Sequence, residues 1–137
     1  MRSLSAALGP PLALVAVAAT GCVGILLADP TTPGGPLPVC PTRALIGLCC
    51  PGCGGLRMVY SLLHGRLGDA VHYNAVSLVF LGLFTWSLMA WTVARVRGRE
   101  QRNWLQWRWT PPVAIAVLTV WFVIRNLPFA PFIELSV

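Results

Sequence analysis

Four of the five cysteines lie in one short stretch, residues 40–57, which reads C-P-T-R-A-L-I-G-L-C-C-P-G-C-G-G-L-R. They are Cys40, Cys49, Cys50 and Cys53. Thiols at this density form structural disulfides, bind thiophilic metal ions, or exchange electrons as a dithiol–disulfide pair. No other segment combines so many reactive or ligating side chains, so we expect the rest of the chain to hold this stretch in place.

A structural disulfide is the favoured hypothesis. The loop that carries the cysteines is expected outside the cytoplasm, where oxidising conditions permit disulfides. Pairing of Cys40 with Cys49 or Cys50 closes a loop of about ten residues, and the chain-entropy model assigns such a loop a stabilisation somewhat under ~3 kcal/mol. Four cysteines allow three sets of pairings, and their spacing does not choose among them.

Metal binding is an alternative, with zinc as the ion. Cys50 and Cys53 have the C-x-x-C spacing that supplies two zinc ligands, and Cys40 can add a third. His64 follows Cys53 by eleven residues, or ~16 Å along a continuous helix, which is too far for the fourth ligand. Cys49 and His72 remain as candidates for that position. The favoured hypothesis predicts no cofactor.

Thiol–disulfide exchange by Cys50 and Cys53 is the other alternative, and it would make the protein an enzyme. Cys53 lies at the start of an expected helix, with Arg57 one turn further on, and both features favour a thiolate. However, C-P-G-C reverses the thioredoxin-type order C-G-P-C, and no βαβ pattern surrounds it. We therefore assign no catalytic residue under the favoured hypothesis.

The surrounding elements are predicted to be membrane-spanning helices. The chain is 56% hydrophobic and only 10% charged, outside the range of ordinary soluble domains. Three long charge-free runs predict spans at about residues 8–28, 75–94 and 110–127, since about 20 apolar residues cross a bilayer. The fold class is therefore all-α: a polytopic integral membrane protein with a single domain, residues 1–137.

Residues 29–74 are predicted to form the cysteine-rich loop and short amphipathic helices. The helix over residues 55–64 carries an apolar stripe and can lie in the membrane interface, and a second helix covers residues 67–73. Asn74 is placed to cap the second span. Arg125 is expected at the end of the third span as an outer-leaflet anchor. The apolar stripe consists of Leu56, Val59, Tyr60 and Leu63, and Gly65 is expected to end that helix.

Arginine distribution predicts the orientation. All ten basic residues are Arg, and six of them precede the first span or lie in the link at residues 95–108, against three in residues 29–74. The positive-inside rule then places the N-terminus and the link in the cytoplasm, and residues 29–74 and the C-terminus outside. This basic charge is explained by the lipid bilayer, and no nucleic-acid partner is expected. A small-residue face formed by Gly21, Gly24 and Ala28 is suited to docking a partner membrane protein.

The order C-P-x(8)-C-P-G-C-G-x-x-R, followed by a short helix, an Asn that opens a span and a closing R-N-L-P, resembles a family of small bacterial membrane proteins known mainly as a domain of unknown function. The resemblance covers residues 40–94 and, more loosely, the R-N-L-P element. Two positions depart from the family pattern. Cys49 stands where proline or an apolar residue is usual, and Ala75 stands where proline is usual. The matching positions are Cys40, Pro41, Cys50, Pro51, Gly52, Cys53, Gly54, Arg57, Asn74, Arg125 and Asn126. Of these, Arg57, Asn74, Arg125 and Asn126 are expected to support the cysteine site.

These observations together predict a non-catalytic protein of the bacterial plasma membrane. Its expected role is that of an accessory or assembly subunit of a larger membrane complex, such as a respiratory one, with a cysteine-stapled loop outside the cytoplasm. The oxidoreductase and the zinc scaffold remain the alternatives. The oligomeric state and the partner are not determined by the sequence.

Overall fold

The computed structural model describes residues 4–32, 40–99 and 104–128, and over these residues it is helical without strands. The predicted all-α class is confirmed. Part of the predicted loop (residues 33–39), Arg102 and the C-terminus lie outside the described residues. The elements are α1 (Leu4–Ala28), α2 (Pro41–Ile46), α3 (Gly55–Leu63), α4 (Leu67–Val96), the 3₁₀ turn η1 (Trp104–Gln106) and α5 (Thr110–Arg125).

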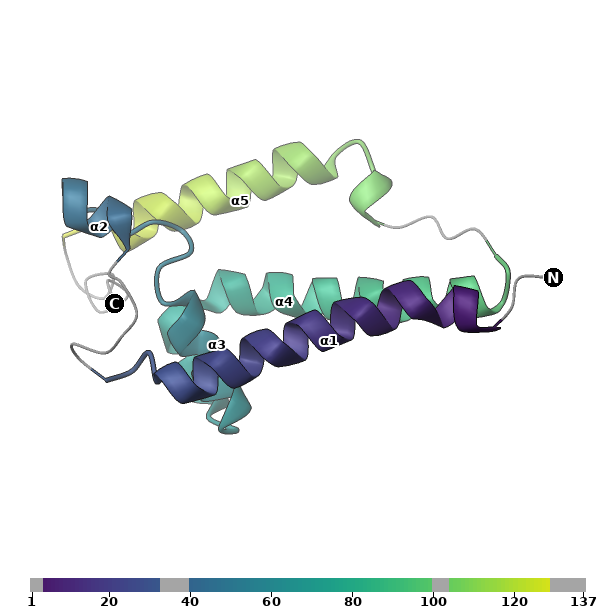
Figure 1. The fold of residues 1–137 in the computed structure, drawn as a ribbon. Helices are drawn as coiled ribbons and strands as arrows, with labels where there is room; N and C mark the ends of the chain where they lie inside the picture. Colours follow the sequence, from purple (N-terminus) through teal and green to yellow (C-terminus); the bar gives the residue numbers. More distant parts are fainter. Residues whose placement is uncertain (1–3, 33–39, 100–103, 129–137) are drawn as a thin grey trace.

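The three long helices run roughly parallel to one axis, and the connecting segments gather at its two ends (Figure 1). Helices α1 and α4 pack against each other, and the short α3 packs against both. Helix α5 runs along the other side of α4, and its last turn lies beside α2. We call residues 40–74 with Arg125 and Asn126 the cysteine end. The opposite end, residues 91–99 with residues 104–110, is the tryptophan end.

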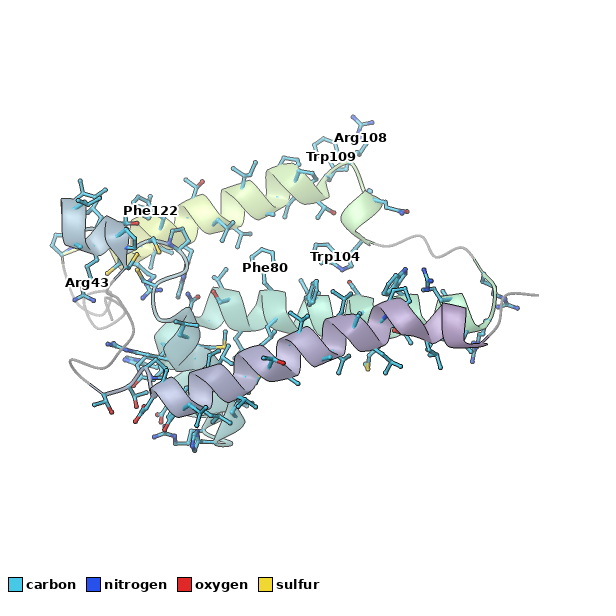
Figure 2. All side chains as sticks on the ribbon, viewed as in Figure 1. Arg43, Phe80, Trp104, Arg108, Trp109 and Phe122 are labelled. Carbon is cyan, nitrogen blue, oxygen red and sulfur yellow. The ribbon has the colours of Figure 1, made fainter. Side chains whose placement is uncertain are left out.

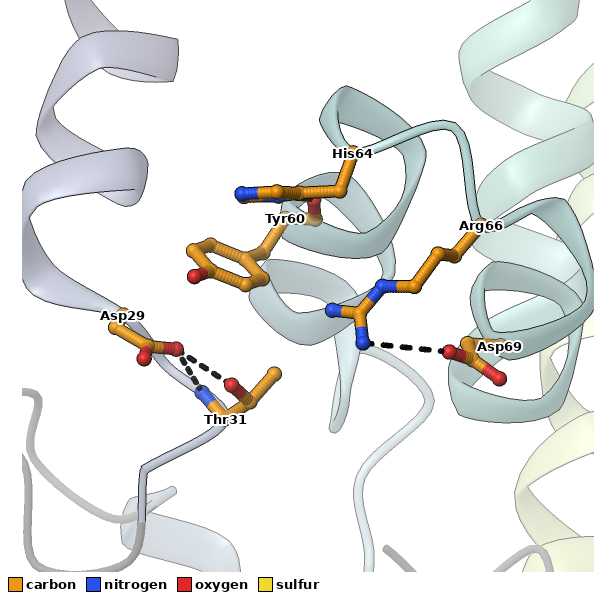
Figure 3. Close-up of polar contacts among 6 residues, drawn as sticks. All are labelled: Asp29, Thr31, Tyr60, His64, Arg66 and Asp69. Atoms are coloured by element: carbon orange, nitrogen blue, oxygen red, sulfur yellow. Dashed lines mark hydrogen bonds and ion pairs between the residues drawn. The ribbon is translucent and has the colours of Figure 1, made fainter.

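Helix α1 ends where the sequence predicted. Its apolar membrane-length part covers Leu8–Ala28, and Asp29 then takes a positive φ of 37° ahead of Pro30. The Asp29 carboxylate accepts a hydrogen bond from the Thr31 backbone N–H at 3.1 Å (Figure 3). This local turn satisfies polar groups at the helix end and directs the chain away from α1.

Helix α4 joins two predicted elements across a kink. The short helix expected at residues 67–73 and the span expected at residues 75–94 form one helix, interrupted at Asn74, whose φ is −164° and ψ is 86°. The Asn74 Oδ1 accepts from the Ser77 N–H at 2.9 Å. The predicted cap on the second span is thus confirmed, although the two helices are not separate.

Helix α3 buries a face other than the predicted apolar stripe, in keeping with the expectation that the stripe can lie in the membrane interface. Met58 and Ser61 are buried, whereas Leu56 and Leu63 of the predicted apolar stripe are 48% and 43% exposed. The apolar periodicity of the helix was recognised correctly. Leu56 and Leu63 of the stripe face outward, as apolar side chains do in a helix that lies in apolar surroundings. The helix ends as predicted, with Gly65 at a φ of +72°.

The surface composition fits a membrane protein. Helices α1 and α4 are long and apolar enough to span a bilayer, whereas α5 has 16 residues, or about 24 Å against a hydrocarbon core of about 30 Å. Large apolar side chains on these helices are exposed, including Leu27 at 83% and Trp86 at 66%. Water-exposed apolar surface of this extent is rare on soluble monomers.

The buried core, by contrast, is small and lies mainly at the cysteine end. Its apolar members among the described residues are Cys49, Cys53, Met58 and Ala70. Along the rest of their lengths α4 and α5 stand apart and border an apolar cavity of about 460 Å³, into which Phe80 and Trp104 project (Figure 2). Buried packing is therefore concentrated at the cysteine end.

Candidate metal centre

Three cysteine side chains meet at the cysteine end. The Sγ atoms of Cys40 and Cys50 are 3.5 Å apart, and those of Cys50 and Cys53 are 3.2 Å apart. All three sulfur atoms lie within 4.8 Å of one another. In a tetrahedral zinc site with Zn–S bonds of ~2.3 Å, neighbouring sulfur atoms are about 3.8 Å apart. One ion can therefore contact all three thiols after small side-chain adjustments. Sulfur atoms are visible between α2 and the end of α5, near Phe122 (Figure 2).

The C-P-G-C segment forms a tight turn that brings two of these thiols together. The Cys53 N–H donates to the Cys50 carbonyl at 3.1 Å, and the Cys50 N–H donates to the Cys53 Sγ at 3.2 Å. Gly54 follows with a φ of +78°, and a Cβ there would lie 2.6 Å from the Tyr73 carbonyl oxygen. Both the backbone conformation and the close approach of α4 require glycine at this position.

Helix α2, which the sequence analysis missed, brings the third thiol into place. Cys40 is its N-cap and Pro41 its first residue, a position where proline lacks no needed N–H. Gly47 ends the helix with a φ of 69°, and the chain then returns to Cys49 and Cys50. The Pro41 and Gly47 pair, six residues apart, was the sequence signal for this helix.

Two asparagines from the long helices fix the backbone of the loop. The Asn74 Nδ2 donates to the carbonyls of Pro51 at 2.8 Å and Cys53 at 3.0 Å. The Asn126 side chain accepts from the Cys49 N–H and donates to the Cys49 carbonyl, each at 2.9 Å. Both residues were predicted to support the site, and the structure brings both to it through main-chain contacts.

Comparison with protein families identifies this segment. Residues 40–88 match DUF2752, a family described as a protein of unknown function. The resemblance to a domain of unknown function is thus confirmed. No curated protein and no solved structure gives a significant match to the chain. We call residues 40–88 the DUF2752 segment; Arg125 and Asn126 lie outside it but contact its backbone.

Arg125 is buried at this site and does not anchor the outer leaflet, as the sequence had suggested. The residue is only 1% exposed, and its Nη1 donates to the Cys53 carbonyl at 2.6 Å. Its guanidinium also lies 5.7 Å from the ring centroid of Trp121. Folding draws Arg125 inward because α5 crosses directly beside the DUF2752 segment, a contact that no local pattern encodes.

Arg57 has a different role from the predicted one. Its Nε donates to the Pro30 carbonyl at 3.0 Å, so it connects α3 to the chain leaving α1. The sequence hypothesis placed it as a cation that favours a Cys53 thiolate. In the structure it instead fixes the end of the first membrane-length helix against the DUF2752 segment.

The pKa of Cys53 is shifted in the direction opposite to the predicted one, and it is Cys40 whose pKa is lowered. Burial and the neighbouring thiols of Cys50 and Cys40 raise the pKa of Cys53 to about 12. The pKa of Cys40 is lowered to about 6, chiefly by the Thr42 hydroxyl and then by the Arg43 backbone N–H. Cys40 caps a helix and so meets several hydrogen-bond donors, which stabilise a thiolate. Cys53, by contrast, is enclosed by the loop.

The predicted disulfide is not formed. All five cysteines, each within the described residues, are free thiols, and the sulfur separations above exceed the bond length of ~2.05 Å. Cys49 does not join the three-thiol group, and Cys22 lies in α1. Of the histidines weighed as ligands, His64 bonds the Tyr60 carbonyl through Nδ1 at 2.9 Å, and His72 is likewise outside the group.

Proposed function

We propose that this protein is an integral membrane protein whose DUF2752 segment holds a thiophilic divalent metal ion, with zinc the foremost candidate, at the membrane surface. The observation that carries the proposal is the convergence of the Cys40, Cys50 and Cys53 Sγ atoms within 4.8 Å. Cysteine sulfur is a preferred zinc ligand, and structural zinc sites stabilise loops that have little core of their own. The loop at the cysteine end has this character.

Three thiolates occupy three of the four positions of a tetrahedral ion. Among the described residues no fourth Cys, His, Asp or Glu joins the group. The fourth position is therefore assigned to water or to a donor atom of another molecule. This arrangement supports a scaffold or assembly role in a larger membrane complex, because a partner can complete the metal site.

The membrane part of the proposal is a three-span topology with residues 40–74 outside the cytoplasm. Two helices have membrane length, and α5 reaches the required length if the span continues to Leu127. The start of α1 and the arginine-bearing end of α4 lie at the same end of the molecule (Figure 1). In intact cells, Gly98→Cys should add no labelling by an impermeant maleimide beyond that of the parent protein. Rapid modification there would reverse the orientation.

Thiol–disulfide exchange is the second candidate, favoured by one observation. Cys40, with its pKa near 6, has its Sγ 3.5 Å from that of Cys50. In a Cys50–Cys53 disulfide, the Cys40 thiolate would attack Cys50 Sγ, form the Cys40–Cys50 bond and release Cys53 as thiolate. That leaving group is unfavourable, because the pKa of Cys53 is raised to about 12 and high-pKa thiols leave slowly. We therefore rank exchange below metal binding.

Elemental analysis of the purified protein tests the proposal. The wild type, purified in mild detergent without chelators, should carry about one zinc per chain, as expected of one tetrahedral site. Cys50→Ser should abolish this, since the Cys50 Sγ lies within 3.5 Å of both other sulfur atoms. Cys22→Ser is the matched control and should retain the metal. A zinc-free wild type that loses two thiols reversibly on oxidation would replace the metal site with the exchange reaction.

A further inference from the structure

Arg125 is a buried cation for which the described residues supply no acidic partner. The acidic residues in the described part of the chain are Asp29 and Asp69, and both have other contacts (Figure 3). Asp29 accepts from Thr31 at 3.1 Å, and Asp69 pairs with Arg66 at 3.7 Å. An uncompensated buried charge is strongly unfavourable, and the two described carboxylates do not offset that of Arg125.

The unpartnered atoms of Arg125 have a specific arrangement. Nη1 is bonded to the Cys53 carbonyl, whereas Nε and Nη2 are buried without a hydrogen-bond partner. Nε and Nη2 form one edge of the planar guanidinium, and this edge is suited to donate two parallel hydrogen bonds to an anion. Both nitrogens are inaccessible to solvent, so an anion that reached them would lie inside the folded protein.

We propose that Arg125 is the counter-charge of the metal–thiolate centre, an inference that rests on the proposed metal site. The residue whose carbonyl Arg125 binds, Cys53, also carries one of the three clustered thiols. Three thiolates with a divalent ion have a net charge of −1, which one guanidinium neutralises. Arg125 thereby offsets the negative charge of three metal-bound thiolates beside the buried Cys53, and the balance favours a divalent over a monovalent ion.

The proposal separates charge from simple loop fixation. Asn126 binds the same loop through two hydrogen bonds but carries no charge. If Arg125 only fixed the backbone, loss of either side chain would have the same consequence. If Arg125 balances charge, its loss should change how many thiolates bind the ion, because a divalent ion with two thiolates is neutral on its own.

Cobalt(II) titration of the full-length protein in detergent tests this, since thiolate-to-cobalt charge-transfer absorbance counts bound thiolates and competition with zinc gives relative affinity. We expect three thiolates in the wild type, in Arg125→Lys and in Asn126→Ala. Arg125→Met should bind with two thiolates and lose roughly 10- to 100-fold in affinity, the range for groups that support metal ligands. Helical content by circular dichroism verifies that each variant is folded.

Each outcome is decisive. An Arg125→Met protein that binds cobalt with three thiolates and wild-type affinity overturns the role of Arg125 but leaves the metal site intact. The same result follows if Arg125→Met and Asn126→Ala lose affinity equally with three thiolates retained, since Arg125 is then only a fixing residue. A wild type that binds no cobalt at the three thiols refutes the proposed function, and the inference fails with it.

Discussion

The two ends of α5 are attached to the molecule in different ways. At the cysteine end, Arg125 and Asn126 make directional hydrogen bonds to the backbone of the DUF2752 segment at 2.6–2.9 Å. At the tryptophan end, the Trp104 indole N–H, which precedes α5, donates a hydrogen bond to the Ser87 hydroxyl of α4. There Arg95 and Arg108 lie over the rings of Trp91 and Trp109 at 5.0 and 5.2 Å. Between the two ends lies the apolar cavity.

This difference shows what each end has to achieve. Helices in a bilayer need only approximate apolar packing and satisfied main-chain bonds, and aromatic and arginine side chains position their ends at the interface. A thiol cluster requires sulfur atoms to be placed to within a fraction of an ångström, which only directional bonds from rigid elements provide. Precision is therefore concentrated where the cysteines meet.

The largest expected effect comes from Gly54→Ala at the cysteine end. The substituted residue would have to keep a φ near +78° and place its Cβ 2.6 Å from the Tyr73 carbonyl, so either α4 or the turn must move. Left-handed geometry alone costs roughly 1–2 kcal/mol for a residue with a Cβ. We expect loss of bound zinc and a clearly lower thermal midpoint. Gly52→Ala is the control, because its Cβ would meet only the Cys50 Sγ, at 3.9 Å.

A paired substitution compares the two attachments of α5 directly. Asn126→Ala leaves the buried Cys49 N–H and carbonyl unpaired and should destabilise the fold by about 1–3 kcal/mol. Trp104→Phe removes one hydrogen bond to Ser87 and retains an aromatic ring, so we expect about 1 kcal/mol or less. Urea titration monitored by circular dichroism measures both. Equal destabilisation would show that the two ends are fixed equally well.

Within the cysteine end, the thiols of the metal-free protein should differ in reactivity. Cys40, with its pKa lowered from 9.0 to about 6, is expected to react with iodoacetamide at a rate that rises through pH 6 and is level by pH 8. Cys53, with its pKa near 12, should react slowly throughout this range. Mass spectrometry of labelled peptides follows each site. Faster labelling of Cys53 than of Cys40 at pH 7 would contradict the described hydrogen bonding.

The smallest effect on stability is expected on the exposed face of α1. Gly24 in α1 has no atom within 4 Å of the position its Cβ would take, so Gly24→Leu should leave folding and zinc content unchanged. If this face docks a partner helix, the substitution should weaken co-purification of that partner. Gly9→Leu, equally unobstructed near the start of α1, is the control. Unchanged complex size in both variants would remove the small-residue face as a docking surface.

The helices were largely predictable from the sequence, because each prediction rested on a local cause. A charge-free run ended by Asp29 and Pro30 gave the limit of α1, and Asn74 was recognised as a cap because capping involves residues only three positions away. The apolar periodicity of α3 was visible, but periodicity does not reveal which face meets protein and which meets lipid. The outward-facing Leu56 and Leu63 show this limit.

The candidate site was predicted in its membership and not in its chemistry. Cys40, Cys50 and Cys53 were named together as possible metal ligands, yet a disulfide that the structure does not contain was favoured, and the pKa of Cys53 was expected to be lowered where it is raised. Both errors concern tertiary contacts: the burial of Cys53 depends on α4 and α5, and Arg125 reaches it across 72 residues of sequence. Spacing within a motif contains no information on such contacts.

The central claim is that three sulfur atoms of the DUF2752 segment bind one metal ion. Zinc-edge X-ray absorption of the purified wild-type protein tests it most directly, because the method reports the number and distance of the atoms bound to zinc. We predict three sulfur atoms at ~2.3 Å with one nitrogen or oxygen neighbour at ~2.0–2.1 Å. A first shell of nitrogen and oxygen alone, or a protein that retains no zinc, would contradict the claim.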